Sequence, residues 1–149
     1  MQSDKYKVLL SFDTEEFDVP REHGVDISME ESMRISRTGT IRILDVLRNN
    51  GVRATFFCTT NFASNAPDVM ERIVAEGHEV AAHGCDHWHP VPDDVANSKR
   101  ILEKLTGLKV RGYRQPRMFP VSEKEIARCG YLYNSSLNPT FILSLIHIS

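Results

Sequence analysis

The sequence lacks long apolar runs, paired cysteines and an excess of one charge, and each lack narrows what the protein can be. No apolar run approaches the ~20 residues that a membrane-spanning helix needs. The three cysteines, Cys58, Cys85 and Cys129, are widely spaced and odd in number, so they predict no disulfide framework. A formal net charge of -2 gives no basic field for nucleic acid or anionic lipid. We expect a globular protein with no nucleic-acid partner and no membrane span.

The N-terminal segment also lacks the features of a secretory signal. It reads MQSDKYKVLLSFD, which has lysines but neither a long apolar stretch nor a small-residue cleavage site. We therefore expect a cytoplasmic protein whose cysteines stay reduced and act as small buried apolar side chains. The length of 149 residues is that of one domain.

Short runs of β-branched and aromatic residues alternate with longer helical patterns. The expected strands span residues 6–12, 53–58, 78–82, 110–115 and 131–133, and the expected helices span 29–50, 66–76, 93–106 and 122–129. This alternation predicts an α/β fold with parallel strands, in which chemistry gathers at the carboxyl ends of the strands. Polar residues follow the expected strand ends: Asp13, Thr59, Thr60, His83, Arg114 and Asn134. We expect these residues to converge on one rim and form a site.

The segment His83-Gly84-Cys85-Asp86-His87 carries the strongest local signal. Two imidazoles four residues apart can bind one metal ion if the segment turns helically, although exposed loop histidines would show the same pattern. His78 and His89 lie in the same stretch, so composition alone leaves the choice of ligands open. A zinc-peptidase helix is excluded, because its histidines are four residues apart and His78 and His83 are five apart. Cys85 is expected to point away from the two histidines.

The acidic segment Asp13-Thr14-Glu15-Glu16 carries the second signal. A metal ion with two histidine ligands commonly takes a carboxylate as its third, and a second carboxylate can act as a general base. An ordinary acidic loop, or a charge cluster at a helix N-terminus, would also explain this segment. Its place after a strand, with the histidines after another strand, favours the metal site.

Several segments, taken in order, resemble motifs of the polysaccharide deacetylase family, the NodB-homology domain of carbohydrate esterase family four. They read SFDTEEF, RATFFC, EGHEVAAHGCDH and GYRQP, with NSSL where a further motif begins. The resemblance covers roughly residues 7–140. It implies about the first five strands of a distorted (β/α) barrel, since a complete barrel needs ~250 residues.

The resemblance also implies roles for individual residues. Asp13 is the catalytic base, Arg114 orients and charge-stabilises Asp13, and His83 and His87 bind a divalent metal ion, with Zn²⁺ expected from the ligand types. Because Thr14 stands where the family commonly has a second aspartate, we expect Glu15 to be the third ligand. Other departures are Gly84 for serine or threonine, which would cost only a supporting hydrogen bond, Asn134 for aspartate, and Arg117 for an aromatic residue.

The function that the resemblance implies is metal-dependent hydrolysis of the N-acetyl group of an acetylated amino sugar or polysaccharide. Two alternatives stay open. One is another C–N hydrolase on the same fold, allantoinase-like or deformylase-like, which can work without a metal ion. The other is a non-catalytic, carbohydrate-binding relative, against which the aligned base Asp13 and its partner Arg114 argue.

The last seven residues, LSLIHIS at 143–149, resemble the translation of a transposase end used in sequencing libraries. We therefore expect residues 1–142 to be the N-terminal part of the domain and residues 143–149 to be foreign to it. Leu145-Ile146-His147 fits the family's general-acid motif as a string, but it lies in this tail and is rejected. The general acid is expected to lie in a C-terminal half that this chain lacks, so the chain alone is expected to be inactive.

Overall fold

A computed structural model describes residues 7–87 and 93–136 of the chain. Five strands form one sheet in chain order, and each neighbouring pair is parallel. They are β1 (Ser11–Thr14), β2 (Thr55–Cys58), β3 (Glu79–Ala82), β4 (Gly112–Tyr113) and β5 (Tyr133–Asn134). Sequential order without reversal is the order of a barrel wall and not that of a doubly wound sheet. The predicted α/β fold with parallel strands is confirmed, and the sheet is open within the described residues.

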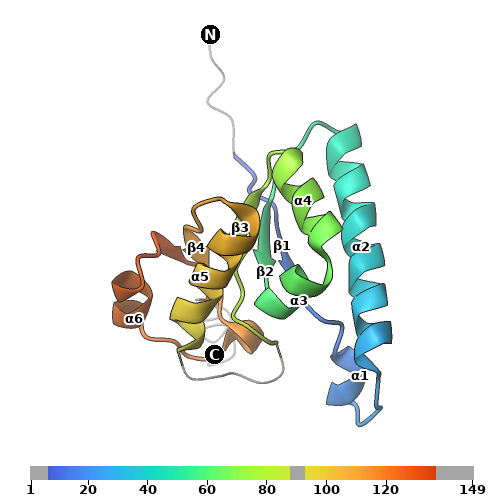
Figure 1. Ribbon diagram of the computed structural model, residues 1–149, viewed down its shortest axis with the longest axis horizontal. Helices are drawn as coiled ribbons and strands as arrows, with labels where there is room; N and C mark the ends of the chain where they lie inside the picture. Colours follow the sequence, from blue (N-terminus) through green and yellow to red (C-terminus); the bar gives the residue numbers. More distant parts are fainter. Residues whose placement is uncertain (1–6, 88–92, 137–149) are drawn as a thin grey trace, which may run out of the picture.

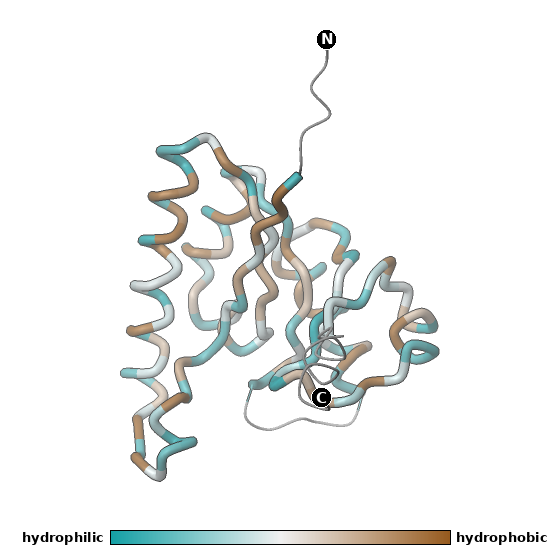
Figure 2. The backbone as a smooth tube through the Cα atoms, turned by 180° about the vertical axis from the view of Figure 1, so that it is seen from behind, coloured by the Kyte–Doolittle hydropathy of each residue, from teal (hydrophilic) through white to brown (hydrophobic). Residues whose placement is uncertain are grey.

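Helices pack against one face of this sheet (Figure 1), and Figure 2 shows the sheet from the other side. The longer helices are α2 (Met29–Asn49), α4 (Pro67–Ala75) and α5 (Asp94–Thr106). Alternation along β2 sorts its side chains between the two faces. Phe56 and Cys58 join the apolar core under the helices, whereas Phe57 lies on the opposite face, against the Arg114 guanidinium and the Tyr133 ring. That opposite face lines a hollow of about 530 Å³.

Local chemistry explains where the main helices begin and end. Ser28 caps α2 by accepting a hydrogen bond from the Glu31 N–H, and Pro67 occupies the first turn of α4, where a missing N–H costs nothing. Helix α5 ends at Gly107, which has the positive φ of 71° that a left-handed cap requires. These signals explain why the predicted spans of the three helices agree with the observed ones to within a residue or so.

The first strand differs from its predicted position. Residues 6–12 were expected to form a buried strand, but β1 begins only at Ser11, and Val8 and Leu9 are 80% and 92% exposed. The reason is pairing: β2 is the only described neighbour of β1, and Ser11 aligns with its first residue, Thr55. The Leu10 carbonyl still accepts from the Thr55 N–H at 3.0 Å, and residues 7–9 run beyond the paired region. Asp13 consequently lies within β1 and not after it.

The sequence patterns missed three short elements. Helix α1 (Val19–Glu22), helix α3 (Thr60–Asn65) and the 3₁₀ turn η1 (Pro116–Met118) are too short to show an apolar period. The last helix, α6 (Glu123–Arg128), was predicted close to its observed place. Thr59, expected on the rim, caps α3, with its hydroxyl accepting from the Phe62 N–H.

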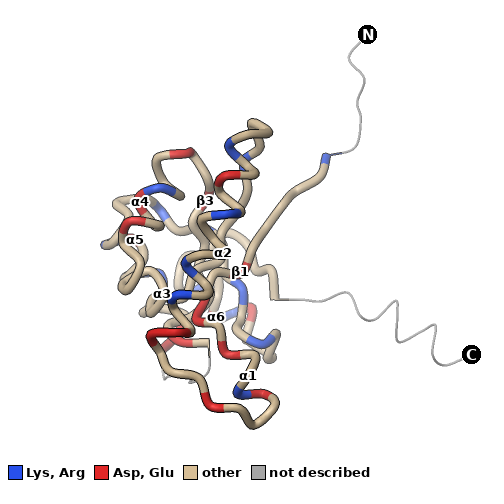
Figure 3. The backbone as a smooth tube through the Cα atoms, turned by 90° about the vertical axis from the view of Figure 1, so that its right-hand side faces the viewer, with Lys and Arg blue, Asp and Glu red and all other residues tan. Residues whose placement is uncertain are grey.

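Some predictions fall outside the described residues. They concern His89 and the tail at 143–149, including Leu145-Ile146-His147. None of the described helices is long and apolar enough to cross a membrane. Figure 3 shows Lys and Arg interspersed with Asp and Glu along the described chain, which agrees with the small net charge.

Candidate functional site

The register of the sheet aligns the carboxyl ends of the five strands. Thr14, Cys58, Ala82, Tyr113 and Asn134 lie side by side as successive partners. The residues that follow them therefore form one row at the rim: Glu15, Thr59, His83, Arg114 and Ser135. This is the edge at which parallel α/β folds place their chemistry.

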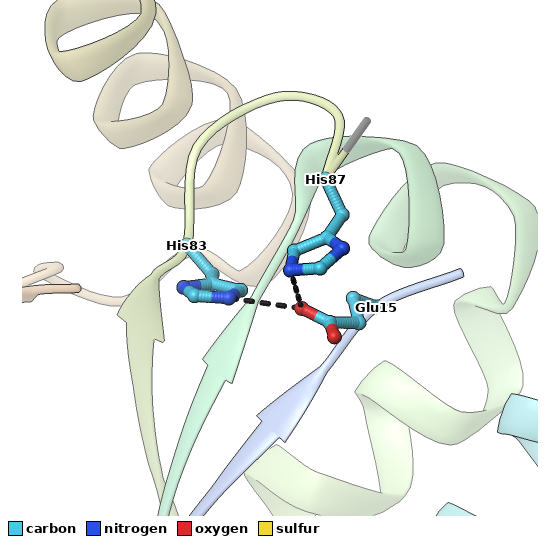
Figure 4. A group of neighbouring side chains, drawn as sticks. All are labelled: Glu15, His83 and His87. Atoms are coloured by element: carbon cyan, nitrogen blue, oxygen red, sulfur yellow. Dashed lines mark ion pairs between the residues drawn. The ribbon is translucent and has the colours of Figure 1, made fainter. Parts of the chain in front are cut away.

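Glu15, His83 and His87 converge at this rim (Figure 4). The Oε2 atom of Glu15 lies 2.9 Å from Nε2 of His83 and 3.2 Å from Nε2 of His87. One atom from each residue lies within 4.8 Å of the others. The His83 side chain is 2% exposed and that of His87 is 11% exposed, so water screens the three groups poorly.

The hydrogen bonds behind the two rings decide which nitrogens carry protons. Nδ1 of His83 lies 2.8 Å from the carbonyl oxygen of Arg114, and Nδ1 of His87 lies 2.7 Å from Oδ2 of Asp18. A carbonyl and a carboxylate only accept, so each Nδ1 is the donor and each neutral ring turns its Nε2 lone pair towards Glu15. Oε2 of Glu15 is itself buried, and neither ring donates a hydrogen bond to it while both rings are neutral. Three lone pairs thus face one another, an arrangement that a cation stabilises.

The protonation behaviour of His83 agrees with this arrangement. Burial lowers its pKa, but the hydrogen bond to Glu15 and the negative charges of Asp13 and Glu15 outweigh burial. The pKa of His83 is therefore raised above its ordinary value. In chemical terms, the site attracts positive charge.

The two histidines meet through a loop and not through a helical turn, which corrects the expectation from their spacing. His83 directly follows β3, and residues 83–87 contain no helix. Gly84 turns the chain with a φ of +72°, and a Cβ there would lie 2.8 Å from Oδ2 of Asp94 and 2.9 Å from Cγ of Pro116. Glycine is therefore required here, and its role is larger than the lost hydrogen bond that we expected.

The loop is held by hydrogen bonds to backbone groups at the start of α3 and to a side chain at the start of α5. In α3, the N–H groups of Thr60 and Asn61 donate to the carbonyls of Gly84 and Cys85. At the start of α5, Oδ1 of Asp94 accepts from the Cys85 N–H at 2.7 Å. The group of possible metal ligands does not include the Cys85 thiol, and burial raises the pKa of this thiol to about 12.

Asp13 and Arg114 form a second pair beside the three converging residues. Nη1 of Arg114 lies 2.5 Å from Oδ1 of Asp13, and its Nη2 donates to Ser11 and Ser135 at 3.0 and 2.9 Å. The guanidinium also stacks 4.0 Å from the centre of the Phe57 ring. Asp13 and Glu15 are two residues apart on a strand and its extension, so they face the same side. The structure thus brings all five predicted site residues together.

Sequence reasoning missed several residues that support this site. Glu16 points away from Glu15, is buried, and accepts hydrogen bonds from Thr59 at 2.8 Å and from Asn61. Burial raises the pKa of Glu16 against the effect of these hydrogen bonds. Because successive residues of an extended chain point to opposite sides, the sequence could have predicted different roles for Glu15 and Glu16. No local signal marks Asp18, Asp94 or Ser135.

Asn134, which was expected at the rim, has a structural role. Its Oδ1 accepts a hydrogen bond from the Ser136 N–H and so shapes the chain after β5.

Comparison with known proteins identifies the family. The sequence profile of one family, described as polysaccharide deacetylase, matches residues 2–122. The chain belongs to the polysaccharide deacetylase family. The resemblance seen in the ordered motifs is therefore confirmed.

Two curated relatives are named deacetylases. The peptidoglycan-N-acetylmuramic acid deacetylase of Bacillus subtilis (strain 168) is 30% identical over 102 residues, which are 62% of this chain and 39% of that protein. A chitooligosaccharide deacetylase of Sinorhizobium fredii is 42% identical over 65 residues, which are 44% of this chain and 28% of that protein. The chain thus spans less than two fifths of the length of these relatives.

Solved structures confirm the barrel-type fold. A crystal structure of Puue allantoinase superposes with a TM-score of 0.67 at 23% identity, covering 85% of this chain and 52% of that one. At this identity the likeness shows the fold alone, because one fold hosts several chemistries. The activity has to be argued from the site.

The donor set of the site fits a divalent metal ion. Two neutral imidazoles and one carboxylate are the protein ligands of many catalytic zinc sites, which leave one position open. The buried Oε2 of Glu15 lies between the Nε2 atoms of His83 and His87, an arrangement that fits such an ion. Glu15, His83 and His87 would hold it.

Proposed function

We propose that the protein containing this chain hydrolyses the N-acetyl group of an acetylated amino sugar within a glycan, with a divalent ion, Zn²⁺ by preference, held by Glu15, His83 and His87. The observation that carries the proposal is the convergence of three lone pairs on one buried point, with the Asp13–Arg114 pair beside it. Family membership supplies the reaction class.

The chemistry divides between the ion and the residues of the chain. A divalent ion supplies Lewis-acid polarisation of the amide carbonyl. Asp13 accepts the proton of the attacking water as general base. Arg114 holds Asp13 in position through an ion pair with its carboxylate. Ser11 and Ser135 fix the Arg114 guanidinium from the other side. The general acid stays a prediction: a histidine outside the described residues.

The test measures acetate release by the full-length product of the gene. Substrates are N-acetylated chitooligosaccharides and peptidoglycan, because relatives are named for acting on these two polymers. We expect a chelator or His83→Ala to abolish both activity and Zn²⁺ binding. Asp13→Asn should lower kcat by about 10²–10⁴-fold while Zn²⁺ still binds, since a base is lost but no ligand. His23→Ala, at an exposed histidine, is the control.

Other outcomes would reject the proposal in distinct ways. Hydrolysis that survives chelation and His83→Ala would favour a metal-independent C–N hydrolase on this fold. Glycan binding without acetate release from any substrate would favour the non-catalytic relative. Loss of metal binding in Asp13→Asn would make Asp13 a ligand and not the base.

A further inference from the structure

Asp18 lies behind His87 and contacts Nδ1, the ring nitrogen that is turned away from Glu15. Nε2 of His87 is 3.2 Å from Glu15, and Nδ1 is 2.7 Å from Oδ2 of Asp18. Asp18 is only 5% exposed, although it is a carboxylate in the segment between β1 and α1. A buried carboxylate needs partners, and this one is close to a ring nitrogen that has to donate.

The position of Asp18 in the fold shows that capping α1 does not explain it. Asp18 is the residue before α1, where an aspartate usually accepts a hydrogen bond from the helix backbone. Its side chain makes no such bond. Its Oδ2 atom instead contacts His87 and Nη2 of Arg117, the latter at 2.9 Å.

Arg117 connects this carboxylate to a third segment of the chain. Its Nη1 donates to Oε1 of Glu22 at 2.8 Å, so one guanidinium bridges both ends of α1. Arg117 and the next residue, Met118, have φ values of 55° and 53°, which non-glycine residues rarely adopt. Such outliers persist only where surrounding contacts hold them, and they gather at functional sites. The ion pairs of Arg117 with Asp18 and Glu22 are contacts of this kind.

The two histidines are therefore held by different means. His83 donates to a backbone carbonyl, that of Arg114, whose place is set by the sheet. His87 lies in a loop and donates to a side chain, which is in turn held by Arg117. The orientation of His87 thus depends on side chains, whereas the orientation of His83 depends on a backbone carbonyl.

We propose that Asp18 is a positioning residue that fixes the Nδ1–H tautomer and the orientation of His87, and that Arg117 holds Asp18 in place. The inference rests on the proposed metal site. Partners of this type behind a metal-binding histidine set ring orientation and ligand basicity, and their loss typically costs 10–100-fold in metal affinity. Arg117, which stands where an aromatic residue was expected, thereby serves the metal site of this chain.

The first test needs no metal ion and no activity. Long-range ¹H–¹⁵N NMR of the metal-free full-length protein, at a pH where its histidines are neutral, reports which nitrogen of His87 carries the proton. We expect the Nδ1–H tautomer in the wild type and a mixture of tautomers in Asp18→Ala. Asp26→Asn, at an exposed carboxylate of the neighbouring loop, should leave the His87 signal unchanged. An unchanged signal in Asp18→Ala would overturn the proposal.

The second test measures Co²⁺, whose visible spectrum reports ligand geometry. By calorimetry, Asp18→Ala should bind Co²⁺ 10–100-fold more weakly with an altered spectrum. Asp18→Asn keeps the size of the side chain and one acceptor oxygen, so its Co²⁺ affinity should fall less. It replaces Asp18→Ala in this test if Asp18→Ala fails to fold. Arg117→Gln should weaken binding less than Asp18→Ala. Wild-type affinity and spectrum in all three variants would refute the positioning role.

These readouts separate this inference from the proposed function. If the wild type binds no metal ion, the proposed function fails, while the tautomer measurement still decides the role of Asp18. If metal binding depends on Asp18 but no acetate is released, the positioning role stands and the deacetylase proposal falls.

Discussion

Among single residues of the candidate site, Gly84 has no room for a side chain. Its φ of +72° is nearly that of Gly107, at +71°, but only Gly84 lacks room for a Cβ. Gly107 has nothing within 4 Å of that position. Comparing the two glycines therefore separates backbone strain from steric conflict.

We predict that Gly84→Ala lowers the free energy of unfolding by about 2–4 kcal/mol, because strain and overpacking add. Gly107→Ala should lower the free energy of unfolding by about 1–2 kcal/mol, because it adds backbone strain but no steric conflict. Urea denaturation of both variants measures the difference. Equal losses would mean that Asp94 and Pro116 move aside without cost.

His78 is a buried histidine that the site does not use. Its Nδ1 accepts from the Ala54 N–H at 3.2 Å, and its ring packs edge-on against Phe56. Burial lowers its pKa, the charges of Arg53 and Arg72 add to this, and Glu76 opposes it. The unfolded chain therefore takes up the proton more readily than the folded one.

The sign of the pH effect follows from this lowered pKa. Stability should fall as the pH drops below 6.5, the ordinary histidine value, towards the lower value of the folded state. His78→Asn keeps an acceptor for Ala54 but cannot titrate, so the stability of the wild type should fall more steeply with acid than that of the variant. Urea titrations between pH 8 and pH 5 test this, and parallel curves would contradict it.

Among the helices, α2 and α3 both begin at a hydroxyl cap, but in different surroundings. Ser28 caps α2 at an exposed position. Thr59 caps α3, is fully buried, and also donates to Oε2 of the buried Glu16 at 2.8 Å. One cap serves a helix alone, and the other also serves a buried carboxylate at the rim.

We predict that Ser28→Ala lowers the free energy of unfolding by about 1 kcal/mol, which is the usual cost of losing an N-cap side chain. Thr59→Val should cost about 2–3 kcal/mol, because it removes the cap and a donor to a buried carboxylate. Chemical denaturation of both variants checks the order. A smaller loss for Thr59→Val would show that Asn61 alone satisfies Glu16.

The molecule as a whole has an open sheet, and β1 has only β2 beside it among the described residues. A free strand edge favours association between copies, and so do exposed apolar residues beside it, such as Val8 and Leu9. We predict that the purified chain of 149 residues self-associates, and that the double change Val8→Lys and Leu9→Lys reduces this. Val46→Lys, at an exposed valine of α2, is the control. Sedimentation velocity at several concentrations measures the effect, and a monomer throughout would refute the prediction.

The local pattern was sufficient for the order of the strands and of the longer helices, and for Glu15, Thr59, His83 and Arg114 at the rim. Strand alternation puts Asp13 and Glu15 on one side, and the parallel sheet brings strand ends together, so His83 and Arg114 could be placed near them. His87 was found through its spacing, although the turn that brings it there depends on Gly84 and not on a helix.

The tertiary structure alone decided what stands behind these residues. Asp18 meets His87 across 69 positions of sequence and Arg117 across 99, and no periodicity links residues so far apart. Likewise, the apolar character of Val8 and Leu9 predicted burial, but their exposure depends on which strands lie beside them. Sequence determined which residues alternate and where elements begin, because those depend on neighbours in the chain. The contacts that orient the site depend on sheet register and loop path, which only the folded molecule sets.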